Sequence, residues 1–128
     1  MSADNVQVLR EGYAAFARQD VPAVMAMFDE NIEWSTPESL PFGGNYSGHA
    51  GVGEFFGALA SHWQELSVEP VEFIADGDTV VVLVHNRAVG AGGPLDMTSV
   101  HLWRMREGKG VSFTEYMDTA RVLKALGQ

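Results

Sequence analysis

The chain has no cysteine, few basic residues and no long apolar run. Without cysteine, its 128 residues form no disulfide, thiolate nucleophile or cysteine-ligated metal site. Eight Lys and Arg against seventeen Asp and Glu give a net charge of −9. This charge argues against binding nucleic acid or anionic membranes, which requires clustered basic residues. No membrane-spanning run or secretory signal pattern is present, so we expect a cytoplasmic protein.

The length and a hydrophobic content of 46% indicate one domain, residues 1–128, with an apolar core. Apolar residues at helical spacing predict a helix over Asn5–Arg18. Asp20 as an N-cap and Pro22 in the first turn predict a second, short helix that ends at about Phe28. A third helix is expected from about Ala50.

The other segments predict strands. Asn31–Pro37 is expected to form a short strand, and the Pro- and Gly-rich residues 38–51 a loop that closes over a cavity. Turn signals separate four further predicted strands, which are Val68–Ala75, Thr79–Val89, Met97–Met105 and Val111–Asp118. Helices followed by an antiparallel meander predict an α+β domain with three N-terminal helices on one sheet face.

A histidine and a glutamate interrupt the apolar faces of the last two predicted strands. Trp103 and Phe113 should share the buried face, and opposed residues of an antiparallel pair lie on one face. A three-residue loop, "EGK", satisfies this condition and places His101 opposite Glu115, with Cβ atoms roughly 5 Å apart. The predicted pairs are Met105–Val111, Trp103–Phe113 and His101–Glu115.

The register of the preceding hairpin is open, because Val80–Val84 is apolar on both faces. One register pairs Val89 with Met97 and places His85 opposite His101. In that register, two histidines and a glutamate form a row across three strands. In the other parity, His85 points to the opposite face.

A carboxylate that accepts from an imidazole fixes its tautomer and raises its basicity, so His101 is a candidate general base and Glu115 its partner. The alternative is a hydrogen-bonded core pair without catalytic function. A metal triad could have the same composition as the set His85, His101 and Glu115. Side chains in a flat row across a sheet do not converge well on one metal ion, so we expect no metal. His49 and His62 are interpreted as surface residues.

Four segments carry a resemblance to a known family: Phe16–Pro37, Tyr46–Phe56, Ala75–Val84 and Val100–Ala120. Together with the order of elements, they resemble the NTF2-like superfamily and, within it, the SnoaL-like polyketide cyclase branch. Ketosteroid isomerases and limonene epoxide hydrolases are related to this branch. The resemblance implies a cone-shaped, curved mixed or antiparallel sheet wrapped against the helices, as in cystatin-like α+β barrels. It also implies an apolar pocket and an outer sheet face that dimerises.

The catalytic residues of these relatives are not reproduced. The isomerases' base, oxyanion tyrosine and protonated aspartate fall on Thr36, Gly12 and His101. The hydrolases' arginine falls on Ser99, and their two aspartates fall on His101 and Glu115. His101 and Glu115 therefore occupy positions where the superfamily keeps acid–base groups.

Face parity and the resemblance predict the ligand-contacting residues Trp34, Thr36, Tyr46, His85, Trp103, Phe113 and Met117. Asp118 is a secondary candidate, because SnoaL-like cyclases use an acid late in the last strand. Its parity is opposite to that of Glu115, which favours a cap or surface residue at the strand end.

We expect an enzyme that needs no cofactor and acts on an apolar cyclic or aromatic molecule by isomerisation or cyclisation. The alternatives are a ligand-binding or dimeric accessory module without turnover, and hydrolysis of the epoxide hydrolase type. A homodimer is expected through outward apolar residues, predicted to be Val80, Val82, Val84, Val100 and Leu102.

Overall fold

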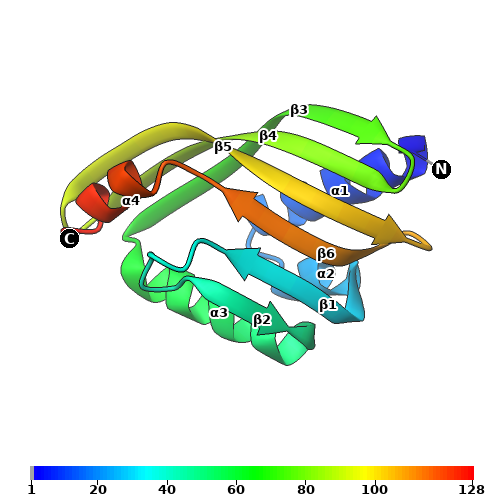
Figure 1. The fold of residues 1–128 in the computed structure, drawn as a ribbon, viewed down its shortest axis with the longest axis horizontal. Coiled ribbons are helices and arrows are strands. Elements are labelled where there is room, and N and C mark those ends of the chain that lie inside the picture. The colour runs from blue at the N-terminus through cyan, green and yellow to red at the C-terminus, as the bar shows by residue number, and fades with distance from the viewer. Residues whose placement is uncertain (1) are drawn as a thin grey trace.

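The computed structural model describes residues 2–128, which form four helices and six strands (Figure 1). The helices are α1 (Ser2–Ala17), α2 (Val21–Ala26), α3 (Gly48–His62) and α4 (Thr119–Ala125). The strands are β1 (Phe28–Thr36), β2 (Gly44–Ser47), β3 (Glu65–Asp76), β4 (Thr79–Gly90), β5 (Gly93–Arg106) and β6 (Lys109–Tyr116). None of these helices is long and apolar enough to cross a membrane.

The six strands form one curved, unclosed sheet in the order β2-β1-β6-β5-β4-β3. Neighbouring strands are antiparallel except for β1 and β6, which are parallel, so the sheet is mixed. α1, α2 and α3 lie on one side of the sheet (Figure 1). α4 lies beside the turn that joins β4 to β5. The predicted α+β class with three N-terminal helices against a curved sheet is confirmed.

Two elements were not predicted. β2 lies within the segment expected to be a loop and pairs with β1, which extends the sheet at one edge. α4 follows β6 directly, and the carboxylate of Asp118 accepts a hydrogen bond from the backbone N–H of Arg121. Asp118 is therefore the N-cap of a short helix, as its parity indicated. Its side chain is exposed, which favours this capping function over a catalytic one.

The β5–β6 hairpin has the predicted register where the candidate pair lies. Trp103 is opposite Phe113, and His101 is opposite Glu115. Both aromatic side chains are buried, which confirms the inward face on which the register was argued. This face carries His101 and Glu115 to the helix side of the sheet.

The predicted Met105–Val111 pair is wrong. The turn contains two residues, Glu107 and Gly108, rather than three, with φ of 52° and 73°. Positive φ at both central residues is typical of a type I′ hairpin turn. Met105 pairs with Gly110, and a β-bulge at Val111 then restores the face parity.

Of the two parities left open for the β4–β5 hairpin, the structure has the one that turns His85 to the opposite face. A two-residue turn at 91–92 joins the strands, so Val89 does not pair with Met97, and Val82 is the residue opposite His101. His85 pairs with Thr98 and lies on the other face. The apolar run that occupies both faces of β4 gave no signal to distinguish the two parities.

The same correction changes the predicted dimer surface. Val80, Val82 and Val84 are fully buried on the inner face. Val100 and Leu102 lie on the outer face as predicted, where they are half-buried. Their β4 neighbours on that face are Val81 and Leu83.

Candidate functional site

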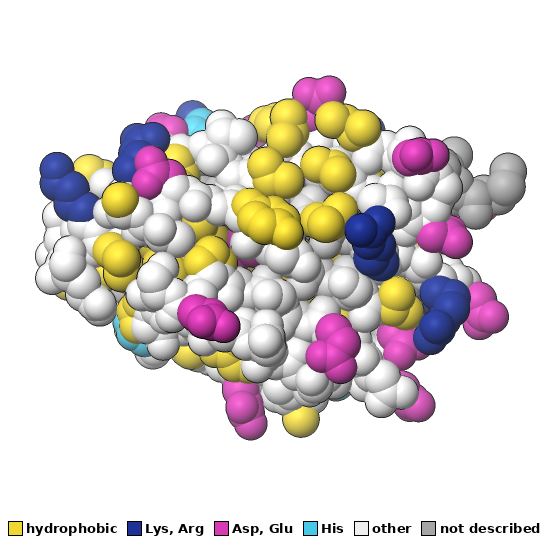
Figure 2. Space-filling view, in the orientation of Figure 1, with side chains coloured by type: hydrophobic (Ala, Val, Ile, Leu, Met, Phe, Trp, Pro, Cys, Tyr) yellow, Lys and Arg dark blue, Asp and Glu magenta, His cyan; other side chains and the backbone are white. Residues whose placement is uncertain are grey.

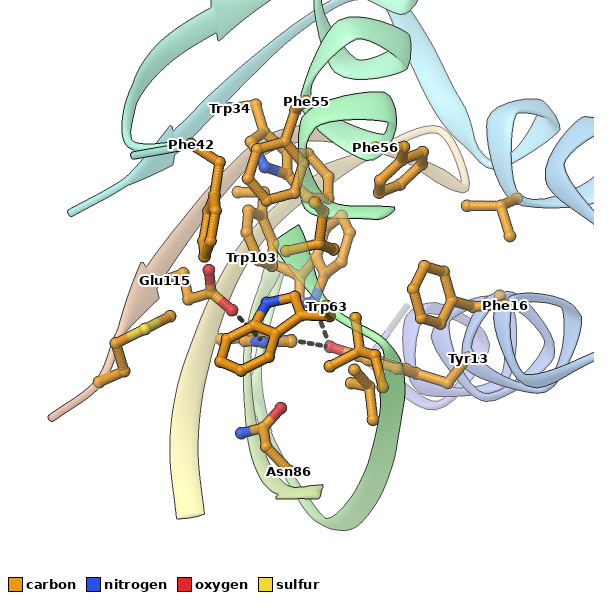
Figure 3. A pocket seen from close by; sticks show the side chains of 18 of the residues that line it. Tyr13, Phe16, Trp34, Phe42, Phe55, Phe56, Trp63, Asn86, Trp103 and Glu115 are labelled. Carbon is orange, nitrogen blue, oxygen red and sulfur yellow. Dashed lines mark hydrogen bonds and ion pairs between the residues drawn. The ribbon is translucent and has the colours of Figure 1, made fainter. Parts of the chain in front are cut away.

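A cavity of about 100 Å³ lies between the inner sheet face and the helices (Figure 3). This enclosed space is too small for a peptide or a nucleic acid. Aromatic side chains dominate its wall, among them Phe16, Trp34, Phe42, Phe55, Phe56 and Trp63. Polar side chains also border it: Tyr13, Asn86, His101 and Glu115.

The polar side chains on one side of the cavity form a continuous hydrogen-bond chain. Trp103 Nε1 donates to Tyr13 Oη at 3.0 Å, and Tyr13 Oη lies 2.6 Å from His101 Nδ1. His101 Nε2 lies 3.1 Å from Glu115 Oε2. Thr36 Oγ1 donates to the other carboxylate oxygen, Oε1, at 2.9 Å. α1 and three strands therefore converge on Glu115.

The chain has one direction. An indole N–H only donates, so Tyr13 Oη accepts from Trp103. Burial raises the pKa of the Tyr13 phenol far above its ordinary range, so the phenol keeps its proton and donates it to His101 Nδ1. Nε2 then carries the imidazole hydrogen and donates to Glu115. Each donor along the chain points towards the Glu115 carboxylate.

His101 and Glu115 pair as expected, and a second hydrogen bond engages His101 from the other side. Both ring nitrogens of His101 are engaged, and its side chain is only 7% exposed, so neither nitrogen is left to take a proton from a ligand. The Glu115 side chain is 14% exposed and lines the cavity. A carboxylate has about four acceptor positions, so Glu115 retains acceptor capacity towards a ligand.

Tyr13 was missed by the sequence analysis. The isomerase comparison placed a tyrosine function on Gly12, which packs so closely on Met27 that an added Cβ would overlap the Met27 sulfur. The tyrosine side chain comes from the next residue of α1 and reaches His101. In the sequence, Tyr13 lies on the apolar side of the predicted helix. Core residues occupy the same side, so this position does not mark a functional residue.

The predicted aromatic wall is present. Four of the predicted ligand-contacting residues line the cavity, namely Trp34, Trp103, Phe113 and Met117. Trp34 stacks on Phe113 with ring centroids 3.8 Å apart. Thr36 does not line the cavity itself, but it donates a hydrogen bond to Glu115, which does.

The other two predicted contacts lie elsewhere. The Tyr46 hydroxyl donates to the carbonyl oxygen of Phe42, which anchors the loop before β2, and Tyr46 does not line the cavity. His85 lies on the outer face with Nε2 2.6 Å from Asp96 Oδ1. This hydrogen bond lowers the pKa of the exposed Asp96 carboxyl. The correction follows from the β4–β5 register and separates His85 from the cavity.

One buried donor in the cavity wall has no partner. Trp34 is 5% exposed. Among the residues that the structure describes, its Nε1 is the one buried side-chain nitrogen or oxygen without a hydrogen bond. An unmatched buried N–H costs about 1–3 kcal/mol. A ligand oxygen next to Trp34 would remove this cost.

The described part of the chain holds no cluster of three or more His, Asp or Glu side chains able to bind a metal. The row that suggested such a triad is not formed, because His85 faces away from His101 and Glu115.

Residues 9–113 match the family model of the SnoaL-like domain. This chain belongs to the SnoaL-like family. It is similar over its whole length to an NTF2-like protein of unknown function from Burkholderia pseudomallei K96243, with 33% identity, 100% of both chains covered and a TM-score of 0.92. The SnoaL-like and NTF2-like resemblance inferred from the sequence is confirmed.

Two further solved structures are similar to this SnoaL-like chain. TerC, co-crystallised with polyporic acid, is 28% identical with a TM-score of 0.92, and the match covers 98% of this chain and 99% of TerC. A putative SnoaL-like polyketide cyclase from Jannaschia sp. CCS1 is 16% identical with a TM-score of 0.85, covering 98% of this chain and 93% of the cyclase. At that identity the cyclase supports the fold alone. No curated protein matches the chain.

Proposed function

We propose that this SnoaL-like protein is an enzyme that moves a proton next to a carbonyl group of an apolar cyclic or aromatic molecule. The observation that carries the proposal is the one-directional hydrogen-bond chain that ends on Glu115 beside an aromatic cavity. A carboxylate held against apolar walls lowers the stability of the fold. Proteins keep such a destabilising group where the group has a function.

Glu115 acts as the base in this proposal. Its carboxylate takes a proton from the carbon next to the ligand carbonyl, and the electron pair of the broken C–H bond moves into an enolate. His101 and Thr36 hold both carboxylate oxygens in position, so His101 is a positioning residue instead of the base expected from the sequence. The enolate then regains the proton at another carbon, which is isomerisation, or attacks a second carbonyl carbon, which is an aldol-type cyclisation.

The enolate oxygen needs a hydrogen-bond donor, and Trp34 Nε1 is proposed for this role. The Trp34 ring belongs to the cavity wall and its N–H is unmatched; because the nitrogen atom itself is covered, the ring has to turn for the N–H to reach a ligand oxygen. Once the ring has turned, a donor held in this position stabilises charge that develops on oxygen.

The ligand is proposed to be aromatic or fused-ring. The ten aromatic side chains in the wall favour flat apolar surfaces by stacked and edge-to-face contacts. TerC, a relative that is 28% identical to this chain, was co-crystallised with polyporic acid, which supports that molecule as a binding probe.

The test is deuterium exchange of the carbon-bound protons next to the carbonyl of 2-tetralone in D₂O, followed by NMR. The protein should accelerate exchange above the buffer rate, and Glu115→Gln should lower the acceleration at least about 100-fold. Glu33→Gln, which changes an exposed carboxylate on β1, is the matched control and should keep the wild-type rate. If wild-type protein binds 2-tetralone or polyporic acid without accelerating exchange, the enzyme proposal fails and the binding module remains.

We also propose that the chain forms a homodimer through its outer sheet face. Six apolar residues meet there across four strands, forming the outer-face patch: Ile74, Val81, Leu83, Val100, Leu102 and Tyr116. Figure 2 displays apolar side chains gathered over this part of the sheet. Ile74 is 50% and Tyr116 56% exposed, and a contiguous apolar area of this kind is typical of an interface.

A further inference from the structure

Asn86 is a polar residue on the inner face of β4 that the hydrogen-bond chain does not include. Its side chain is buried, and Nδ2 donates to Ser99 Oγ at 2.6 Å. Since the amide nitrogen is held by this bond, the amide oxygen Oδ1 is the atom that faces the cavity, as Figure 3 shows. No hydrogen bond within the described residues reaches Oδ1.

Ser99 is the polar neighbour of the Asn86 amide on the inner face, and it engages only the amide nitrogen. The other neighbours on this face are apolar: Val84 and Ala88 on β4, and Met97, which is the partner of Asn86 on β5. Oδ1 has no partner among the described side chains and is not a sealed polar atom, so it is open to a ligand in the cavity. The bond to Ser99 fixes the amide so that its acceptor stays directed into the cavity.

We propose that Asn86 Oδ1 accepts a hydrogen bond from a hydroxyl group of the ligand, at the end opposite to the carbon from which Glu115 takes a proton. The inference rests on the proposed function and adds the substrate class: a hydroxylated, fused-ring ketone. Asn86 is then the residue that selects hydroxylated ligands.

The sheet geometry sets the direction in which this ligand lies. Asn86 is four residues along β4 from Val82, which is about 13 Å at about 3.3 Å per residue. His101 is opposite Val82 and Glu115 is opposite His101, so Glu115 lies two strands, or about 10 Å, across the sheet from Val82. A ligand that reaches both Asn86 and Glu115 therefore lies diagonally across the inner face.

The experiment compares 6-hydroxy-2-tetralone with 2-tetralone. Wild-type protein should process the hydroxylated ketone with a kcat/KM about 10-fold higher, because one further hydrogen bond forms in a desolvated site. Asn86→Leu should remove this preference, so that its kcat/KM values for the two ketones agree to within about 2-fold. The control Asn45→Leu, at an exposed position on β2, should keep the preference.

Ser99→Ala is the second variant. It frees the amide to rotate and should reduce the preference without removing the acceptor, and it keeps the test available if Asn86→Leu does not fold. A preference that persists in both folded variants, or in Ser99→Ala when Asn86→Leu does not fold, overturns the inference.

Equilibrium binding of both ketones, measured by tryptophan fluorescence, separates this inference from the proposed function. Binding that favours the hydroxylated ketone in wild type but not in Asn86→Leu supports the role of Asn86 even where exchange is absent. Exchange that depends on Glu115 with equal binding of both ketones supports the proposed function and contradicts the role of Asn86.

Discussion

At the scale of residues, Tyr13 determines what the predicted His101–Glu115 pair can do. The pair was predictable because a histidine and a glutamate among apolar strand residues are rare and their opposition follows from face parity. Tyr13 was not predictable, because a tyrosine on the apolar side of a helix has the pattern of a core residue. Its hydroxyl occupies the nitrogen that a catalytic imidazole would use, which moves the base role to Glu115.

Tyr13→Phe should lower the free energy of unfolding at pH 7 by about 1–3 kcal/mol, because buried Trp103 Nε1 loses its acceptor. The raised pKa of Tyr13 adds a pH dependence. The protonated phenol is favoured in the folded state, so this contribution is complete below the ordinary tyrosine pKa of about 10 and is lost as the pH rises above it. Chemical denaturation between pH 7 and 11 measures both effects.

Tyr116→Phe is the control, because Tyr116 is exposed on the outer face of the monomer; all three proteins are compared at a concentration below that of dimer formation. The difference in stability between wild type and Tyr13→Phe should shrink above pH 10, whereas the difference between wild type and Tyr116→Phe should stay near zero. A Tyr13→Phe difference that stays constant up to pH 11 would show that burial of this phenol does not affect its ionisation.

At the scale of elements, the two hairpins differ in how well their registers could be predicted. In β5–β6, large aromatic residues occur on one face only, so the parity was decided even though the turn length was wrong. In β4–β5, valines occupy both faces and a two-residue turn replaces the expected longer one. α4 and β2 were missed because a helix of seven residues and a strand of four carry too few periods to show a pattern.

The bulge at Val111 is the device that brings Glu115 to the inner face. If Val111 were paired instead of bulged, the two-residue turn would set Trp103 opposite Ser112 and turn Phe113 and Glu115 outwards. Inserting one alanine after Val111 adds a second extra residue and disturbs this phase again, so we expect it to cost more than about 3 kcal/mol of stability. Val111→Ala keeps the bulge and should cost about 1 kcal/mol, since Val111 is half-buried. Urea denaturation compares the two, and an insertion variant as stable as Val111→Ala would contradict the role of the bulge.

At the scale of the whole molecule, the fold was predictable and the surface was not. The order of helices and strands and the family resemblance gave the curved sheet and its helix layer. The outer-face patch required the β4 register, which the sequence left open, and its residues on β4 are Val81 and Leu83 instead of the three valines first expected.

The proposed homodimer is tested by adding a charge to this patch. Wild-type protein at about 50 μM should sediment as a dimer, and Leu83→Lys should shift it to monomer, because an interface core does not tolerate an unpaired charge. Val21→Lys is the matched control, at an exposed valine on α2, and should remain dimeric. A monomeric wild type in sedimentation equilibrium would rule out the dimer.

The central claim is that His101 acts only through Glu115, and a double-mutant cycle on 2-tetralone exchange tests it most directly. The four proteins are wild type, Glu115→Gln, His101→Phe and the double variant, each with its thermal unfolding recorded to establish that it is folded. His101→Phe alone should reduce exchange by less than Glu115→Gln, and the double variant should be no slower than Glu115→Gln, since a positioning residue has no effect once its carboxylate is gone. Additive losses, or a His101→Phe loss as large as that of Glu115→Gln, would contradict the account and return the base role to His101.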